Sequence, residues 1–165
     1  MSEHVELGKV ALNGDSDGFL SRQCPSCRRV FKRPISRMQD SDASPAAYCP
    51  YCGATPEGRW DTDAQAAYFQ AHAARLGAEY VATQFREMLE GLSSSFLQVS
   101  REQADLPPDP GAPPPESLEG FRLVRVPCHP DDPLKIDAPW SDDVACPLCG
   151  ITYPISDVAG LGSSQ

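Results

Sequence analysis

Apolar residues recur in steps of four and three along the middle of the chain. The series is Trp60, Ala64, Ala67, Ala71, Ala74, Ala78, Val81, Phe85, Met88, Leu92 and Phe96. This heptad-like stripe predicts one long amphipathic helix over residues 61–99, about 55 Å in length. Thr62 and Gln65 fit a capping box at its start. Asp61 and Asp63 place negative charge there, at the positive end of the helix dipole.

A helix of this length cannot cover its own apolar stripe. The first half of the stripe is mostly alanine, which lets another backbone approach closely, and the second half is bulky. Two interpretations stay open: the helix packs on the protein's own zinc modules, or it meets a second copy or a different partner.

Short apolar runs on either side of the helix predict β-strands in two small modules. The first module covers residues 18–60, where Pro34 ends a strand or holds it at a sheet edge. The second module covers residues 119–158. The expected strands are 19–23 and 30–33 in the first module, and 121–126, 134–137, 144–145 and 151–153 in the second.

The remaining segments are poor in apolar residues. Six prolines within positions 107–115 predict a semi-rigid, extended spacer over residues 100–118. An SH3-type ligand is less favoured there, because basic residues are lacking nearby. Residues 1–17 mix Gly, Asp, Ser and Asn with little periodicity, and residues 159–165 are small and polar, so both segments are predicted to be flexible tails.

Seven cysteines supply the candidate chemistry. Cys24, Cys27, Cys49 and Cys52 have the spacing C-x2-C-x21-C-x2-C, which is typical of a structural zinc site with four thiolates. Modules of about 40 residues need a metal, disulfides or a partner to fold. A secreted disulfide framework is the rival interpretation. It would leave one cysteine unpaired, and the polar N-terminus lacks a signal-peptide pattern, so zinc in the cytoplasm is favoured.

The other three cysteines, Cys128, Cys146 and Cys149, need a fourth ligand for a second zinc ion. Asp131 has the regular spacing from Cys128 but is a shorter, harder oxygen ligand. His129 offers an imidazole nitrogen, which commonly accompanies thiolates on zinc. We favour His129, with Asp131 as the alternative.

The motifs CPSC, CPYCG and CPLCG resemble the metal-binding knuckles of the zinc-ribbon superfamily. The resemblance covers the two modules, about half of the chain. It implies a three-stranded antiparallel sheet in each module, with two knuckles holding one zinc ion. The expected fold class is therefore a small zinc-stabilised α+β protein, with two zinc β-ribbons joined by a long amphipathic helix and a Pro-rich linker.

Enzyme classes with related motifs fit poorly. A zinc deaminase needs a glutamate beside a metal ligand, and no glutamate follows Glu119. A thioredoxin-like redox site needs a βαβ context that the pattern does not predict. His4 and His72 stand apart from the other candidate ligands and are expected to be surface residues. We therefore expect no catalytic activity.

The net charge of −9 argues against general attraction to nucleic acid. One basic run without acids interrupts the pattern: Arg22, Arg28, Arg29, Lys32, Arg33 and Arg37. Four of these, Arg28, Arg29, Lys32 and Arg33, are candidate phosphate contacts, and Phe31 could stack on a base. The alternative for Arg28 and Arg29 is that they offset the charge of metal-bound thiolates.

The function favoured by these patterns is a zinc-binding protein-interaction module, an adaptor or assembly subunit. Its partner would be another protein or a second copy, bound through the helix 61–99. The alternative is a nucleic-acid-binding or transcription-related zinc-ribbon protein that uses residues 22–37. A membrane span and a small-molecule substrate are not expected. The excess of arginine over lysine and the abundant alanine are typical of a GC-rich bacterial genome.

Overall fold

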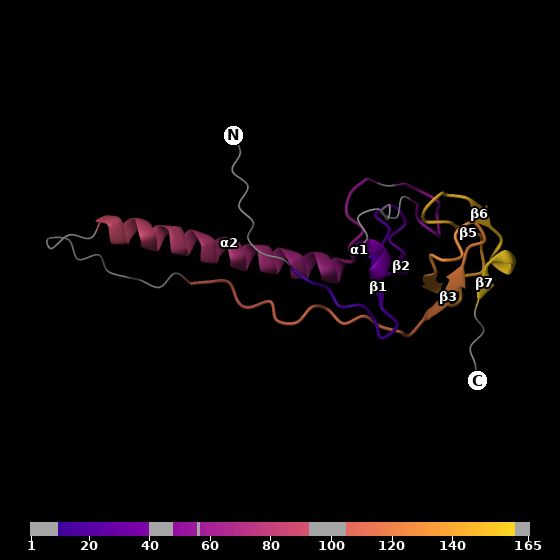
Figure 1. The fold of residues 1–165 in the computed structure, drawn as a ribbon, viewed down its shortest axis with the longest axis horizontal. Coiled ribbons are helices and arrows are strands. Elements are labelled where there is room, and N and C mark those ends of the chain that lie inside the picture. Colours follow the sequence, from indigo (N-terminus) through magenta and orange to yellow (C-terminus); the bar gives the residue numbers. More distant parts are fainter. Residues whose placement is uncertain (1–9, 40–47, 56, 93–104, 161–165) are drawn as a thin grey trace. The chain divides into compact units, whose positions relative to one another are not determined.

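The computed structural model describes residues 10–39, 48–55, 57–92 and 105–160. It is a small α+β protein with one long helix and antiparallel strands (Figure 1). The chain divides into two compact units. One contains Met1–Ala11 and Ala64–Pro114, and the other contains Leu12–Asp63 and Pro115–Gln165. Both cysteine-rich modules therefore lie in the second unit.

That second unit is built on a five-stranded antiparallel sheet in the order β1-β2-β4-β3-β7. The strands are β1 (Phe19–Gln23), β2 (Val30–Pro34), β3 (Phe121–Arg125), β4 (Leu134–Asp137) and β7 (Ala159–Gly160). A separate pair is formed by β5 (Val144–Ala145) and β6 (Thr152–Tyr153). Two short helical turns complete the unit: α1 (Ile35–Gln39) and η1 (Ile155–Asp157). The predicted strands are thus present, whereas α1 and β7 were not predicted.

One register pair joins the two cysteine-rich modules into a single sheet. Lys32 of β2 lies opposite Lys135 of β4 in an antiparallel pair. The sequence pattern suggested two ribbons far apart along the chain, each with its own small sheet. Pairing covers the edges that β2 and β4 would otherwise leave open to other chains, and such edges favour aggregation. It also buries Phe31 and Ile136, which are both fully inaccessible.

The core of this unit consists of two clusters with a tyrosine between them. The first contains Cys24, Phe31, Cys49 and Trp60. The second contains Val124, Val126, Leu134, Ile136, Val144, Cys146 and Val158. Tyr51 packs against both clusters. Half of the first cluster is cysteine, so its stability depends on what the sulfurs bind.

The segment before β1 differs from the expected flexible tail. Residues 1–9 lie outside the described residues, but Asp15 is buried and its backbone pairs with Phe19. The physical reason is that Asp15 accepts hydrogen bonds from the ammonium groups of Lys32 and Lys135. A pattern based on polarity does not reveal such a partner far along the chain.

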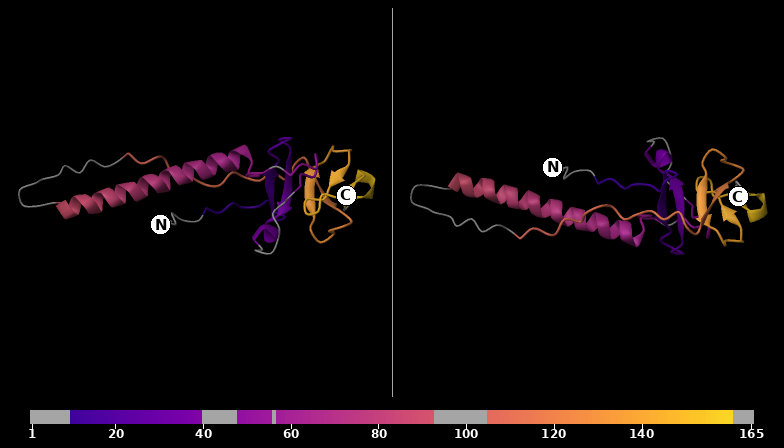
Figure 2. Two further views of the ribbon diagram at one scale, coloured as in Figure 1. Left: turned by 90° about the horizontal axis from the view of Figure 1, so that it is seen from above. Right: turned by 90° about the horizontal axis from the view of Figure 1, so that it is seen from below.

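The long helix of the other unit, α2, runs from Asp63 to Leu92 and is continuous in every view (Figures 1 and 2). Its predicted extension over residues 93–99 lies outside the described residues. The Pro-rich segment 105–114 carries no regular secondary structure, and the carbonyl of Pro107 accepts a hydrogen bond from Arg75 of α2 at 2.9 Å. No helix in the described part of the chain is long and apolar enough to cross a membrane.

Most of the stripe predicted for α2 is exposed, although Trp60, which precedes the helix, is buried and Ala78 is partly buried. Val81, Phe85 and Met88 are 65%, 56% and 53% exposed. The alanines 64, 67, 71 and 74 are exposed as well. The partly buried residues of α2 follow a different set of positions, which includes Phe69, His72, Leu76 and Glu79.

Candidate metal centres

The first candidate centre contains the four cysteines of the first module. Cys24 follows directly after β1, and Cys27 lies in the turn that leads to β2. Cys49 and Cys52 come from a second turn, after the undescribed residues 40–47. The four sulfurs lie within 4.8 Å of one another, with 3.8 Å between Cys24 and Cys52 and 3.7 Å between Cys27 and Cys49.

Three turns share one backbone geometry that aims two sulfurs at a common point. In each, the residue after the second cysteine has a positive φ: 62° at Arg28, 64° at Gly53 and 76° at Gly150. The N–H of that residue donates to the carbonyl of the first cysteine, at 2.9 Å in all three turns. Glycine adopts this conformation without strain, so the motifs CPYCG and CPLCG suit it, whereas Arg28 adopts it at a cost.

The backbone of these turns also donates hydrogen bonds to the sulfurs. Burial raises the pKa of Cys24, but N–H groups of Cys27 and Ser26 lower it more, and the net shift is downward. Burial is the largest effect on Cys49 and raises the pKa of that thiol well above its usual range. Four thiolates cannot be held here without a cation, because their charges would repel one another in a partly buried space. The four sulfurs are therefore a donor set that could hold a metal ion.

The second candidate centre contains Cys128, His129, Cys146 and Cys149, whose ligand atoms also lie within 4.8 Å of one another. The sulfurs of Cys128 and Cys149 are 3.5 Å apart. His129 Nδ1 lies 3.4 Å from Cys128 Sγ and 3.3 Å from Cys146 Sγ. Burial raises the pKa of Cys146 to about 12, whereas the N–H of Ile151 lowers the pKa of the exposed Cys149.

Of the two ligands considered for the fourth position, His129 lies in the cluster. Asp131 is exposed, and its backbone carbonyl accepts a hydrogen bond from Arg37 at 3.1 Å. The turn explains this choice, because the N–H of His129 donates to Val126 and its carbonyl accepts from Asp132. These bonds, at 3.1 Å each, fix the backbone on both sides of the imidazole. The neighbouring Cys128 raises the pKa of Tyr153 to about 12.

Both clusters fit a tetrahedral metal ion. Zinc bound by thiolates at about 2.3 Å places two sulfurs about 3.8 Å apart, close to the distances in the first centre. An imidazole nitrogen at about 2.0–2.1 Å places the nitrogen about 3.6 Å from each sulfur, slightly more than in the second centre. Thiolate and imidazole donors favour zinc among common ions. With four protein donors in each site, no ligand position is left for a substrate, which is typical of a structural centre.

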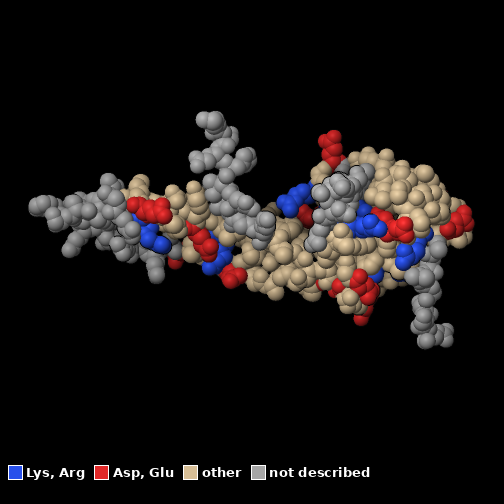
Figure 3. Space-filling model, viewed as in Figure 1, with Lys and Arg blue, Asp and Glu red and all other residues tan. Residues whose placement is uncertain are grey.

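The basic run at residues 22–37 is paired within the protein. Lys32 and Arg33 have side chains only 1% and 3% exposed. Arg22 pairs with Asp61, Arg28 with Asp63, Arg29 with Asp137 and Arg33 with Asp132. On the face drawn in Figure 3, basic and acidic groups lie next to one another. Of the four candidate phosphate contacts, only Arg28 and Arg29 are exposed, and their ion-pair partners are carboxylates.

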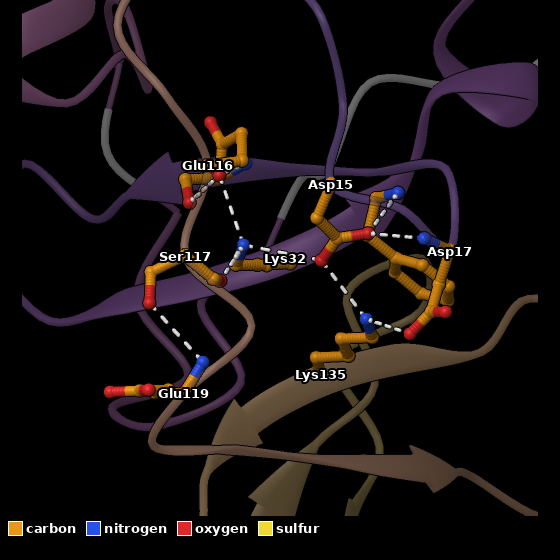
Figure 4. Close-up of polar contacts among 9 residues, drawn as sticks. Asp15, Asp17, Lys32, Glu116, Ser117, Glu119 and Lys135 are labelled. Atoms are coloured by element: carbon orange, nitrogen blue, oxygen red, sulfur yellow. Dashed lines mark hydrogen bonds and ion pairs between the residues drawn. The ribbon is translucent and has the colours of Figure 1, made fainter.

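The sequence pattern did not predict a buried cluster of ionic side chains, which lies where β2 pairs with β4 (Figure 4). Asp15 Oδ2 accepts from Lys32 Nζ at 3.2 Å and from Lys135 Nζ at 2.9 Å. Lys32 also donates to Glu116 Oε2 at 3.0 Å, and Lys135 to Asp17 Oδ2 at 2.6 Å. The available signal was a lysine within each of two apolar strands, VFKRP and LKID, where a buried charge needs a partner.

Comparisons with protein-family models, curated proteins and solved structures give no match.

Proposed function

We propose that this chain is a zinc-stabilised protein-interaction protein, an adaptor or assembly subunit of zinc-ribbon type. The observation that carries the proposal is the exposed stripe of α2. Val81, Phe85 and Met88 follow one another at heptad spacing, and all three are more than half exposed. Isolated apolar residues on a surface are ordinary, but an ordered row on one helix face is typical of a surface that binds another protein.

The spacing of the stripe favours a helix as its partner. A repeat of 3.5 residues suits two helices that wind around each other, whereas a helix packed in a globular core follows 3.6. A second copy of the chain fits well in antiparallel orientation. Ala67 would then lie opposite Phe85, and Ala71 opposite Val81, so that a small residue meets a bulky one at each level.

The metal centres have a structural role in this proposal. Each has a complete set of four protein donors, which supports folding of a small unit rather than catalysis. The nucleic-acid alternative gains little support, because Lys32 and Arg33 are buried and the other basic residues of the run have partners. If it held, a fluorescent oligonucleotide would bind in a salt-sensitive way, and changing Arg28 and Arg29 to Glu would abolish the binding.

The proposed self-association is tested on the full chain by light scattering coupled to size exclusion, over a range of concentrations. We expect a dimer mass that shifts to monomer when Phe85 and Val81 are both changed to Ser. Tyr80→Ser is the matched control, since Tyr80 is 41% exposed on α2 but outside the stripe. A strictly monomeric wild type at all concentrations would refute the second copy as partner. Equal effects of the control and the stripe variant would refute the stripe as the contact surface.

A further inference from the structure

The turn that carries Cys49 and Cys52 lies between the two candidate metal centres. This turn, residues 48–52, is here called the shared knuckle. Its sulfurs belong to the first centre. Its backbone, however, pairs with the turn of the second centre: the N–H of Tyr48 donates to Pro147 at 3.2 Å, and the N–H of Ala145 donates to Pro50 at 2.9 Å. The two hydrogen bonds flank Cys146, a ligand of the second centre.

Side chains of the shared knuckle strengthen this connection. The hydroxyl of Tyr51 donates to the carbonyl of Val30 at 2.7 Å and accepts from the N–H of Asp137 at 2.9 Å. It therefore connects the start of β2 to the end of β4. Its ring packs edge-on against Trp140, with 4.9 Å between the ring centroids. The shared knuckle thus contacts both halves of the sheet.

The turn that carries Cys146 and Cys149 leaves room for the shared knuckle to pack closely against it. A Cβ atom on Gly150 would lie 2.6 Å from the ring of Tyr48, closer than non-bonded carbon atoms approach. Gly150 directly follows the ligand Cys149, and its φ of 76° is required by the turn. Gly150 therefore permits both the positive φ of the turn and the close contact with Tyr48 of the shared knuckle.

From this arrangement we propose that the two centres load metal cooperatively, so that an ion in either site raises the affinity of the other. The shared knuckle belongs to no strand of the five-stranded sheet. It is held by the ligands of the first centre, by the hydroxyl of Tyr51 and by its backbone hydrogen bonds to the turn of the second centre. A metal in the first centre orders this turn and with it the backbone around Cys146. The second ion then binds to a site that is already ordered, so less conformational entropy is lost on binding. Thermodynamic linkage requires that an ion in the second centre raise the affinity of the first centre by the same factor.

Cobalt(II) titration of the full chain tests this proposal, because a four-sulfur site and a three-sulfur, one-nitrogen site give distinct visible spectra. The affinity of the first centre is measured in wild type and in a Cys146→Ser, Cys149→Ser variant. We expect the variant to bind cobalt at the first centre at least about tenfold more weakly, within the range usual for coupled sites. A change of less than twofold would overturn cooperative loading.

A second comparison weakens the connection between the two centres through Tyr51, which is not a ligand of either centre. Tyr51→Phe removes both hydrogen bonds of the hydroxyl while retaining the ring. The change is made in wild type and in the Cys146→Ser, Cys149→Ser variant, which completes a thermodynamic cycle. The coupling factor is the ratio of the cobalt affinities of the first centre with and without an intact second centre. We expect Tyr51→Phe to lower this factor by about threefold or more. Tyr80→Phe on α2 is the matched control and should leave the factor unchanged. A coupling factor that Tyr51→Phe leaves unchanged would contradict the role of the shared knuckle in the proposal.

Discussion

Replacement of Asp15 by Asn gives the sharpest test of how the second unit is held together. The Asp15 side chain is fully buried, and it lies between Lys32 and Lys135, which are 1% and 8% exposed. Its other oxygen accepts from the N–H groups of Asp17 and Phe19, at 3.1 and 3.0 Å. Asparagine has nearly the same shape, so Asp15→Asn removes the charge and leaves the packing in place.

The expected loss is set by the buried charges that remain. Removing one partner of a buried ion pair costs about 3–5 kcal/mol, because the other charge is left uncompensated. Lys32 keeps Glu116 and the carbonyl of Ser117, and Lys135 keeps Asp17, which is 59% exposed. These partners offset part of the cost, so we expect the lower end of the range, about 3 kcal/mol.

Urea denaturation of the metal-loaded protein measures this change in the free energy of unfolding. Asp17→Asn is the matched control: it changes an acid in the same cluster, but an exposed one, and should cost less than about 1 kcal/mol. If Asp15→Asn costs no more than Asp17→Asn, the cluster does not hold the sheet together and the reasoning is refuted.

The same carboxylate makes stability depend on pH. Burial raises the pKa of Asp15, but the N–H of Phe19 and the ammonium groups of Lys135 and Lys32 lower it more, and the net pKa lies below its ordinary value. A group with a lowered folded pKa contributes stability above its unfolded pKa, about 3.9, and loses it as the pH falls through the folded value. The difference in unfolding free energy between wild type and Asp15→Asn should therefore be constant from pH 5 to 7 and shrink below about pH 4. A difference that stays constant down to pH 2 would contradict this assignment.

The remaining predictions concern the metal turns. His129→Ala should lower the zinc content of purified protein from two ions to one, whereas Asp131→Ala should keep two, as measured by elemental analysis; loss of zinc in both variants would contradict the ligand set. Arg28→Gly should raise the free energy of unfolding by up to about 1 kcal/mol, because glycine adopts a φ of 62° without strain. The lost ion pair with Asp63 is exposed and offsets little of this gain, and a clear destabilisation in thermal or urea unfolding would refute the strain argument.

The sequence was most informative where structure depends on local spacing. Two cysteines three positions apart need only one turn to meet, so the knuckles could be predicted from the motifs alone. The strand at 121–125 and the helix from residue 63 likewise follow from local alternation and periodicity. The choice between His129 and Asp131 depended on the direction of a proline-containing turn, which spacing alone does not fix.

What escaped prediction depends on contacts between distant parts of the chain. The pairing of β2 with β4 brings Lys32 and Lys135 together across about a hundred residues. Nothing in either strand specifies the other by polarity, since both are short strands that mix apolar and charged residues, VFKRP and LKID. The buried Asp15 escaped for the same reason, as it lies in a polar segment whose neighbours in sequence are exposed.

The positions of Lys32 and Lys135 suggest a reason for burying charge where β2 pairs with β4. Apolar residues there would pack about as well, and replacement of buried ion pairs by apolar groups is often neutral or stabilising. An apolar joint, however, would allow β2 and β4 to slide by two residues with the same faces buried. In the observed register Lys32 and Lys135 lie opposite each other, and the carboxylate of Asp15 accepts from both. The ionic cluster therefore favours one register, and this register places the shared knuckle against the second metal centre.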